Sequence, residues 1–168
     1  MWARTFGQED VSSPEIDSSN QENAWSLGSR WRNDLFGVEG LYVDVGEDFN
    51  PEVGFIRRRG IRRIRSEMQY SPWPRKFGIR RVRIGPEFDY IFNQDNQLET
   101  RDMAFSSFFE LESGGWINFQ TNHTFEHLEE QEGIRGITIP VGEYSFSSFS
   151  TMIESDENKM ISGRIGAG

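Results

Sequence analysis

The sequence predicts an all-β domain folded as an antiparallel up-and-down β-meander. The chain has 168 residues, which fits one domain, 1–168, and its 17 glycines and 14% aromatic residues favour strands and turns. Bulky residues alternate with small or polar residues with a period of two along most of the chain, as they do in strands. Polar turn sequences separate these runs, and no apolar run approaches the roughly 20 residues of a membrane-spanning helix.

The first predicted hairpin shows the alternation most clearly. Residues 24–32 and 35–45 each alternate bulky with small or polar residues, and Asn33-Asp34 between them predicts a two-residue turn. The bulkier parity of the two strands is expected on one face, and it contains Trp25, Leu27, Trp31, Phe36, Val38, Gly40 and Tyr42.

The same pattern returns in five later runs, at residues 87–92, 98–112, 116–128, 143–153 and 160–167. Turns are expected at residues 93–96, 113–115 and 156–158, and the arginine-rich stretch 46–65 is expected to form a loop and the start of a strand. We therefore expect eight or nine strands and no helix. Each strand should pair antiparallel with its neighbour in sequence, as in a meander and not in a Greek key.

Two features favour part of an outer-membrane-type β-barrel over an ordinary β-sandwich. Several predicted strands run ten or more residues, whereas globular strands cluster near about five or six and a tilted membrane strand needs about 9 to 11. The second face mixes Gly, Ala, Ser, Thr and Asn with scattered charge, which is typical of the lumen side of a membrane barrel. A large soluble antiparallel sheet shares the alternation and stays open as the alternative.

Several short runs resemble a known family. Residues 41–58, LYVDVGEDFNPEVGFIRR, and residues 70–75, YSPWPR, resemble the C-terminal domain of unknown function 5916. Residues 98–101, LETR, and 139–144, IPVGEY, also fit its pattern, so that the likeness covers most of residues 24–168. The DFNPEVGF run is its most specific part.

The resemblance implies an outer-membrane β-barrel-like domain of a bacterial envelope protein, with outer-membrane lipid or lipopolysaccharide as its partner. Members commonly carry an N-terminal carbohydrate-binding family 9-like module, which implies a link to glycan binding or handling. This sequence lacks that module and a signal peptide, and it ends at Gly166-Ala167-Gly168 in place of a closing aromatic strand, so we interpret it as a fragment. Residues 8–23, rich in serine and acids, are expected to form a flexible loop.

Positive charge is concentrated in residues 57–83. This segment contains ten arginines, one lysine and one acid, Glu67, and has a net charge of +10. The remaining residues hold 7 basic and 26 acidic side chains, for a net charge of −19. We interpret the arginines as balancing nearby acids such as Glu47, Asp48 and Glu52. The alternative is contact with lipopolysaccharide phosphates or another anion, since arginine is a bidentate donor, through Arg57, Arg58, Arg59, Arg62, Arg63, Arg80 and Arg81.

Nucleic acid is not expected as a partner, because the overall net charge is −9. The absence of cysteine excludes disulfides, zinc–thiolate sites and thiol nucleophiles. His123 and His127 would lie on one face of a strand about 13 Å apart, which is too far for one metal ion. A cation site is the alternative to a solvated loop for the acidic run of Glu126, Glu129, Glu130 and Glu132.

We predict no catalytic residue, cofactor or metal site, because no serine has an adjacent histidine and acid. The family resemblance adds none, since the chemistry of that domain is not established. The alternative function is a soluble all-β domain, periplasmic or extracellular, that binds a carbohydrate or a protein partner through aromatic faces such as Trp25 and Trp31.

Overall fold

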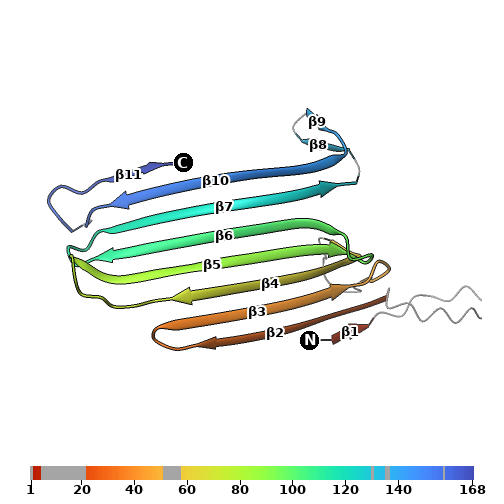
Figure 1. The fold of residues 1–168 in the computed structure, drawn as a ribbon, viewed down its shortest axis with the longest axis horizontal. Helices are drawn as coiled ribbons and strands as arrows, with labels where there is room; N and C mark the ends of the chain where they lie inside the picture. Colours follow the sequence, from red (N-terminus) through yellow and green to blue (C-terminus); the bar gives the residue numbers. More distant parts are fainter. Residues whose placement is uncertain (1, 5–21, 51–57, 130, 135–136, 157) are drawn as a thin grey trace, which may run out of the picture.

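The described residues form one large antiparallel β-sheet in one layer, together with a small two-stranded sheet (Figure 1). The computed structural model describes residues 2–4, 22–50, 58–129, 131–134, 137–156 and 158–168. Nine strands form the sheet in the order β1-β2-β3-β4-β5-β6-β7-β10-β11, and β8 and β9 pair separately. The strands are β1 (Trp2–Arg4), β2 (Asn23–Arg32), β3 (Phe36–Val45), β4 (Ile61–Tyr70), β5 (Ile79–Asn93), β6 (Leu98–Leu111), β7 (Trp116–Leu128), β8 (Glu132–Ile134), β9 (Ile137–Ile139), β10 (Gly142–Glu154) and β11 (Arg164–Ala167).

The predicted all-β up-and-down meander is confirmed. Every pair of neighbouring strands is antiparallel, and apart from the excursion through β8 and β9 each strand pairs with the next one in sequence. The sheet is open, with β1 at one edge and β11 at the other, as Figure 1 shows. Among the described residues, no helix is long and apolar enough to cross a membrane.

Strand bounds agree closely with the alternation where the pattern is unbroken. The predicted run 116–128 is β7 without a change, whereas β5 begins at Ile79 and not at residue 87. β11 begins at Arg164 and not at residue 160, because turns and bends occupy the described residues just before it. Residues 8–21 of the expected 8–23 loop lie outside the described residues, and Asn23 already belongs to β2.

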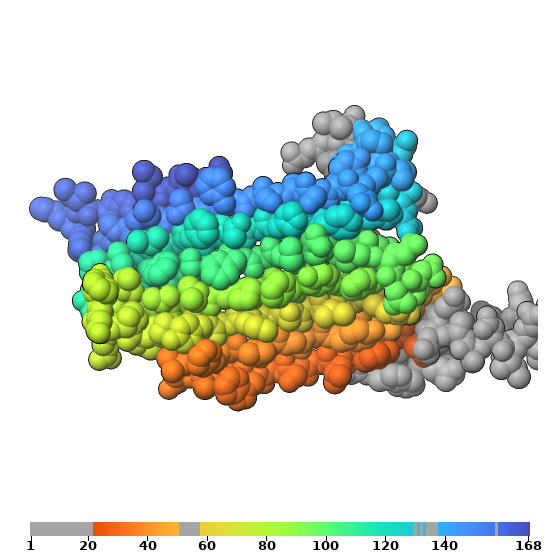
Figure 2. Space-filling model, viewed as in Figure 1, coloured from red at the N-terminus to blue at the C-terminus, as the bar shows by residue number. Residues whose placement is uncertain are grey.

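Within the described residues, the apolar side chains of the sheet have no second layer to pack against. Of the large apolar residues in the described part of the chain, only Val45 and Phe49 are buried, and no side chain there is fully buried. Figure 2 shows the strands side by side across the viewed face, with no described element crossing over them. A layered domain buries one face of its sheet against another element, and the described residues contain no such element.

The two ends of the strands differ in their connections. The left end in Figure 1 holds the connections 33–35, 71–78, 112–115 and 155–163, whereas the right end holds the longer connections 46–60 and 129–141 together with the turn 94–97. The left-hand connections are tied to each other, since the backbone N–H of Ser71 donates to the Leu35 carbonyl at 2.6 Å and that of Glu112 donates to the Gly78 carbonyl at 2.8 Å.

A turn follows β2 as predicted, but its two central residues are Asp34 and Leu35 and not Asn33 and Asp34, because the Asn33 backbone N–H donates to the Phe36 carbonyl at 2.8 Å. The Asn33 side chain stabilises this turn. The Asn33 Oδ1 atom accepts hydrogen bonds from the backbone N–H of Leu35 at 2.8 Å and of Phe36 at 2.7 Å. This is an Asx-type turn, in which the side chain replaces a missing backbone acceptor.

The β4–β5 ladder contains one close approach. The pairing of β4 with β5 is interrupted at Gly85 and Pro86. It has the same register on both sides of the interruption, where Glu67 pairs with Glu87 and Tyr70 pairs with Ile84. Proline has no N–H to donate to the ladder, and a Cβ at Gly85 would lie 1.8 Å from the Met68 carbonyl oxygen. Only glycine therefore fits at position 85 with the two strands this close.

Candidate functional site

Strand register divides the side chains of the sheet between two faces of different chemistry. Directly paired residues lie on the same face, so Leu27, Tyr42, Ile64 and Tyr90 form one row across four strands. We call this side the apolar face and define it by Trp25, Leu27, Trp31, Phe36, Val38, Tyr42, Ile64, Met68, Tyr70, Ile84, Phe88, Tyr90, Phe92, Met103, Phe105, Phe109, Ile117, Phe119, Phe125, Phe149, Ile153 and Ile165.

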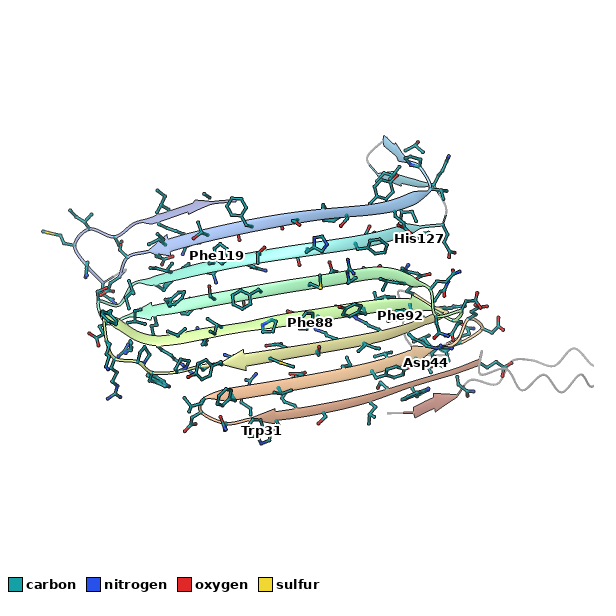
Figure 3. All side chains as sticks on the ribbon, in the orientation of Figure 1. Trp31, Asp44, Phe88, Phe92, Phe119 and His127 are labelled. Atoms are coloured by element: carbon teal, nitrogen blue, oxygen red, sulfur yellow. The ribbon has the colours of Figure 1, made fainter. Side chains whose placement is uncertain are left out.

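Large side chains on the apolar face remain open to the surroundings. Leu27 is 68% exposed, Phe149 is 62% exposed and Trp31 is 57% exposed, although all three lie within strands. Figure 3 labels members of this face on β2, β5 and β7, among them Trp31, Phe88 and Phe119. Aromatic rings pack against each other across strands, with 4.9 Å between ring centroids for Trp25 and Tyr42 and again for Phe36 and Tyr70.

Polar residues also lie on the apolar face, chiefly near the ends of the strands that are on the right in Figure 1. The His123 ring lies against two serines of β10, with its Nδ1 atom 2.8 Å from the Ser147 Oγ and its Nε2 atom 3.3 Å from the Ser145 Oγ. His127 lies on the same face, as its even spacing predicted, 3.8 Å from the Glu143 carboxylate. The described residues hold no group of three or more His, Cys, Asp or Glu side chains placed to bind a metal ion.

The opposite side, here called the polar face, carries a series of ion pairs across β2 to β5. It also holds apolar side chains, namely Leu41, Phe108, Trp116, Phe146 and Met152. Arg30 holds the Glu39 carboxylate through two hydrogen bonds of 2.7 Å. Arg63 makes a bidentate contact with Asp89, and Arg65 pairs with Glu87. On β6 and β7 the acid has a neutral partner in place of an arginine. The Thr124 hydroxyl of β7 donates to the Asp102 carboxylate of β6 at 2.6 Å.

A hollow of about 540 Å³ opens at the left-hand end of the polar face. The residues that matter for its chemistry are Arg32, Gln69, Ser71, Trp73, Arg81 and Arg83. A second hollow of about 250 Å³ shares Gln69 and Arg83 with the first and is floored in part by Gly85. Glu67 and Glu87 also line the second hollow, whose one arginine is Arg83. We therefore restrict the name arginine hollow to the first, where Arg32, Arg81 and Arg83 lie with one acid, Asp34.

The sequence-predicted anion residues do not converge. Arg62 lies on the apolar face, 3.6 Å from Asp44, whereas Arg63 lies on the polar face. Arg58 pairs with Glu99 at 2.8 Å, Arg59 donates to the Asn50 Oδ1 at 3.3 Å, and Arg80 pairs with Glu110 at 3.0 Å. Arg81 alone among the described candidates lines the hollow, and Arg57 lies outside the described residues.

The acids that pair with these arginines differ from those nearest in sequence. Ion pairs of the described residues join the β4 arginines to Asp44 on β3 and to Glu87 and Asp89 on β5, and Glu47 and Asp48 join none of them. Strand pairing explains the choice, since residues opposite one another across a ladder lie closer than loop residues of nearby sequence number. Glu52 lies outside the described residues.

Sequence reasoning missed Arg32 and Arg83 as members of one site. Arg32 precedes the basic window by 25 positions, yet register places Arg32, Gly37 and Gln69 in one row on the polar face. The parity of Arg32 within its strand was the available signal. It becomes informative only when the register of β2, β3 and β4 is known.

The chain matches no protein-family model, no curated protein and no solved structure.

Proposed function

We propose that the chain is part of the wall of an outer-membrane β-barrel in a bacterial envelope protein, with the apolar face toward lipid and the polar face toward an aqueous lumen. The observation that carries the proposal is the uncovered apolar face of a one-layer sheet. Each large apolar side chain left in water costs about 1.5 to 3 kcal/mol relative to burial. Acyl chains are the surroundings that remove this cost without a second layer of protein.

Strand length supports the same assignment. The seven long strands run from 10 to 15 residues, whereas a tilted membrane strand needs about 9 to 11 and ordinary globular strands have about 5 or 6. Strands longer than the thickness of the membrane's hydrocarbon core extend beyond it on one or both sides. Their extra residues then carry the polar ends and the connections.

The position of the apolar side chains along the strands supports a tilt. On β2 and β3 they extend from one end of the strand to the other, whereas on β10 the large ones are Phe149 and Ile153, toward the left-hand end, and Ser145 and Ser147 occupy the right. In Figure 1 the left-hand ends step further left from the β2–β3 turn to the β10–β11 turn. A diagonal apolar band is expected when strands cross a membrane at an angle, as they do in barrels at about 35 to 45°.

Connection length favours one orientation. Membrane barrels have short periplasmic turns and longer external loops, so the left-hand end with the 33–35 and 112–115 turns is assigned to the periplasm. The family resemblance stated for residues 41–58 and 70–75 agrees with an outer-membrane location and is the basis for a link to glycan handling. Additional strands would have to pair with β1 and β11 to close the barrel.

Tryptophan quenching tests the assignment, because the two faces carry their own reporters. One variant keeps Trp31 of the apolar face and a second keeps Trp116 of the polar face, with the other tryptophans changed to Phe. In liposomes, brominated acyl chains should quench Trp31 strongly and Trp116 little, and aqueous acrylamide should do the reverse. Equal quenching of both, or a monodisperse monomer that unfolds cooperatively in buffer without detergent, contradicts the membrane wall and favours the soluble binding domain.

A further inference from the structure

We infer that the arginine hollow is a binding site for a small oxyanion, a solute that carries a phosphate or carboxylate group. The site would be formed by Arg32 of β2 and by Arg81 and Arg83 of β5, beside Gln69 and Ser71. The inference rests on the proposed function in one respect, namely that the polar face is open to water. Under the orientation given above, the site would lie at the periplasmic mouth of the lumen.

Unbalanced charge is the first argument for a ligand. In the described part of the chain, neither Arg32, Arg81 nor Arg83 has a carboxylate within ion-pair distance. Arginines elsewhere on the same face, such as Arg30 and Arg65, are each paired with a glutamate. Asp34 is the one acid in the lining of the arginine hollow. The lining therefore contains three guanidinium groups and one carboxylate.

Two of the three guanidinium groups, those of Arg81 and Arg83, lie against aromatic rings. Arg81 lies over the Trp73 ring at 4.7 Å from its centroid, and Arg83 lies over the Phe108 ring at 4.5 Å. Such cation–π contacts fix the plane of the group and leave its edge free for hydrogen bonds in that plane. A site that is organised before the ligand arrives loses less entropy on binding.

One donor of the lining has no acceptor within the described residues. The Arg81 Nε atom is shielded from solvent and has no hydrogen-bond partner within the described residues. The terminal nitrogens of Arg81, which lines the hollow, are the atoms of this guanidinium group that would donate to an oxyanion there. Gly37 adds room, because a Cβ there would lie 3.3 Å from the Arg32 Nε atom and press on that side chain.

The nearest polar side chains are already paired with one another and not with the arginines. Gln69 donates from its Nε2 atom to the Ser71 Oγ at 3.0 Å, and Ser71 is buried. They form a neutral floor beside the charged groups. Planar guanidinium forks match the geometry of carboxylate and phosphate oxygens, which identifies the ligand class.

Titration calorimetry in detergent micelles at low salt tests the site, with inorganic phosphate and citrate as separate probes. The test variant combines Arg32→Gln, Arg81→Gln and Arg83→Gln. The control combines Arg30→Gln, Arg65→Gln and Arg80→Gln, which removes the same charge from ion-paired positions. We expect at least about tenfold weaker binding in the test variant, a loss that corresponds to one charge-assisted hydrogen bond, and a change within about twofold in the control.

Equal weakening in both triple variants would show attraction by net charge and would overturn the site, as would wild-type protein that binds neither probe. If the test variant loses its β-type circular dichroism, single Arg32→Gln and Arg83→Gln variants replace it, and unchanged binding in both contradicts the site. The preferred probe distinguishes a phosphate-bearing from a carboxylate-bearing solute. Lipid quenching of Trp31 is measured separately, so failure of the membrane assignment and failure of the anion site give different results.

Discussion

The two faces of the sheet are made by alternate residues of the same strands, yet they reach stability in different ways. On the polar face, Arg63 and Asp89 satisfy one another across the β4–β5 ladder. On the apolar face, Phe88 and Met103 pair across the β5–β6 ladder with no further layer of described protein above them. The polar face balances the charge of Arg30, Arg63 and Arg65 by ion pairs within the sheet, whereas the apolar face depends on what surrounds the protein. Under the proposed function, the sheet would separate lipid from an aqueous lumen.

Neighbouring residues of β6 offer the strongest way to break this comparison. Phe105 lies on the apolar face and Ala104 on the polar face, next to Glu87 in register. Phe105→Lys should destabilise the protein folded in lipid by about 2 to 4 kcal/mol, the cost of a cation near the middle of a lipid-facing surface. Ala104→Lys should change stability little, because the new ammonium group lies beside the Glu87 carboxylate.

Urea titration of the lipid-folded protein measures the pair of variants, and the free energies of unfolding are compared at matched lipid concentration. Equal destabilisation by the two lysines would mean that the faces are not in different environments. Destabilisation by Ala104→Lys alone would reverse the assignment of the faces.

The glycines give the next largest effect and test the geometry of the ladder. A Cβ at Gly85 would lie 1.8 Å from the Met68 carbonyl oxygen, whereas a Cβ at Gly40 on the apolar face would meet nothing within 4 Å. Gly85→Ala should therefore cost about 1 to 3 kcal/mol or more, as overpacking does. Gly40→Ala should be neutral or slightly stabilising, since alanine loses less backbone entropy than glycine in a strand. Denaturant unfolding of both variants decides the question, and equal stabilities would show that β4 and β5 are further apart at Gly85.

The smallest effect comes from the ion pairs of the polar face and should scale with burial. The Asp89 side chain is 16% exposed and its Arg63 partner 38% exposed, whereas Arg30 and Glu39 are 64% and 37% exposed. Arg63→Gln should cost about 1 to 2 kcal/mol, because it leaves a half-buried carboxylate without its cation. Arg30→Gln should be indistinguishable from the wild type in the same unfolding assay. The double variant Arg63→Gln/Asp89→Asn should recover part of the loss, and no recovery would show that the pair itself contributes little.

Most of the sheet could be predicted from the alternation of side chains. The run 116–128 was placed correctly because its pattern is unbroken between two clear turns. The start of β5 was missed because arginines occupy both parities at positions 80, 81 and 83, which hides the period of two, and because Gly85 and Pro86 suggest a turn. A bulge between Ile79 and Arg81 shifts the parity there as well.

The arginine hollow could not be predicted from the sequence, because it depends on register between strands. Arg32 and Arg83 are 51 positions apart in the chain and reach one groove only through the successive pairing of β2, β3, β4 and β5. Alternation gives the face on which each arginine lies. It does not give the row, and the row decides which arginines share a groove and which meet an acid.

The order of the strands also affects how the sheet is formed. From β2 to β7, each strand pairs with the next strand in sequence. Most of the connections that must close are therefore short and have a small entropic cost, with 46–60 as the longest. Contacts between residues close in sequence favour rapid folding, and a hairpin such as β6–β7 can present a free edge to the next strand as soon as it forms. The sheet can therefore grow one strand at a time from any hairpin, and growth stops only where the chain supplies no further strand to the edge.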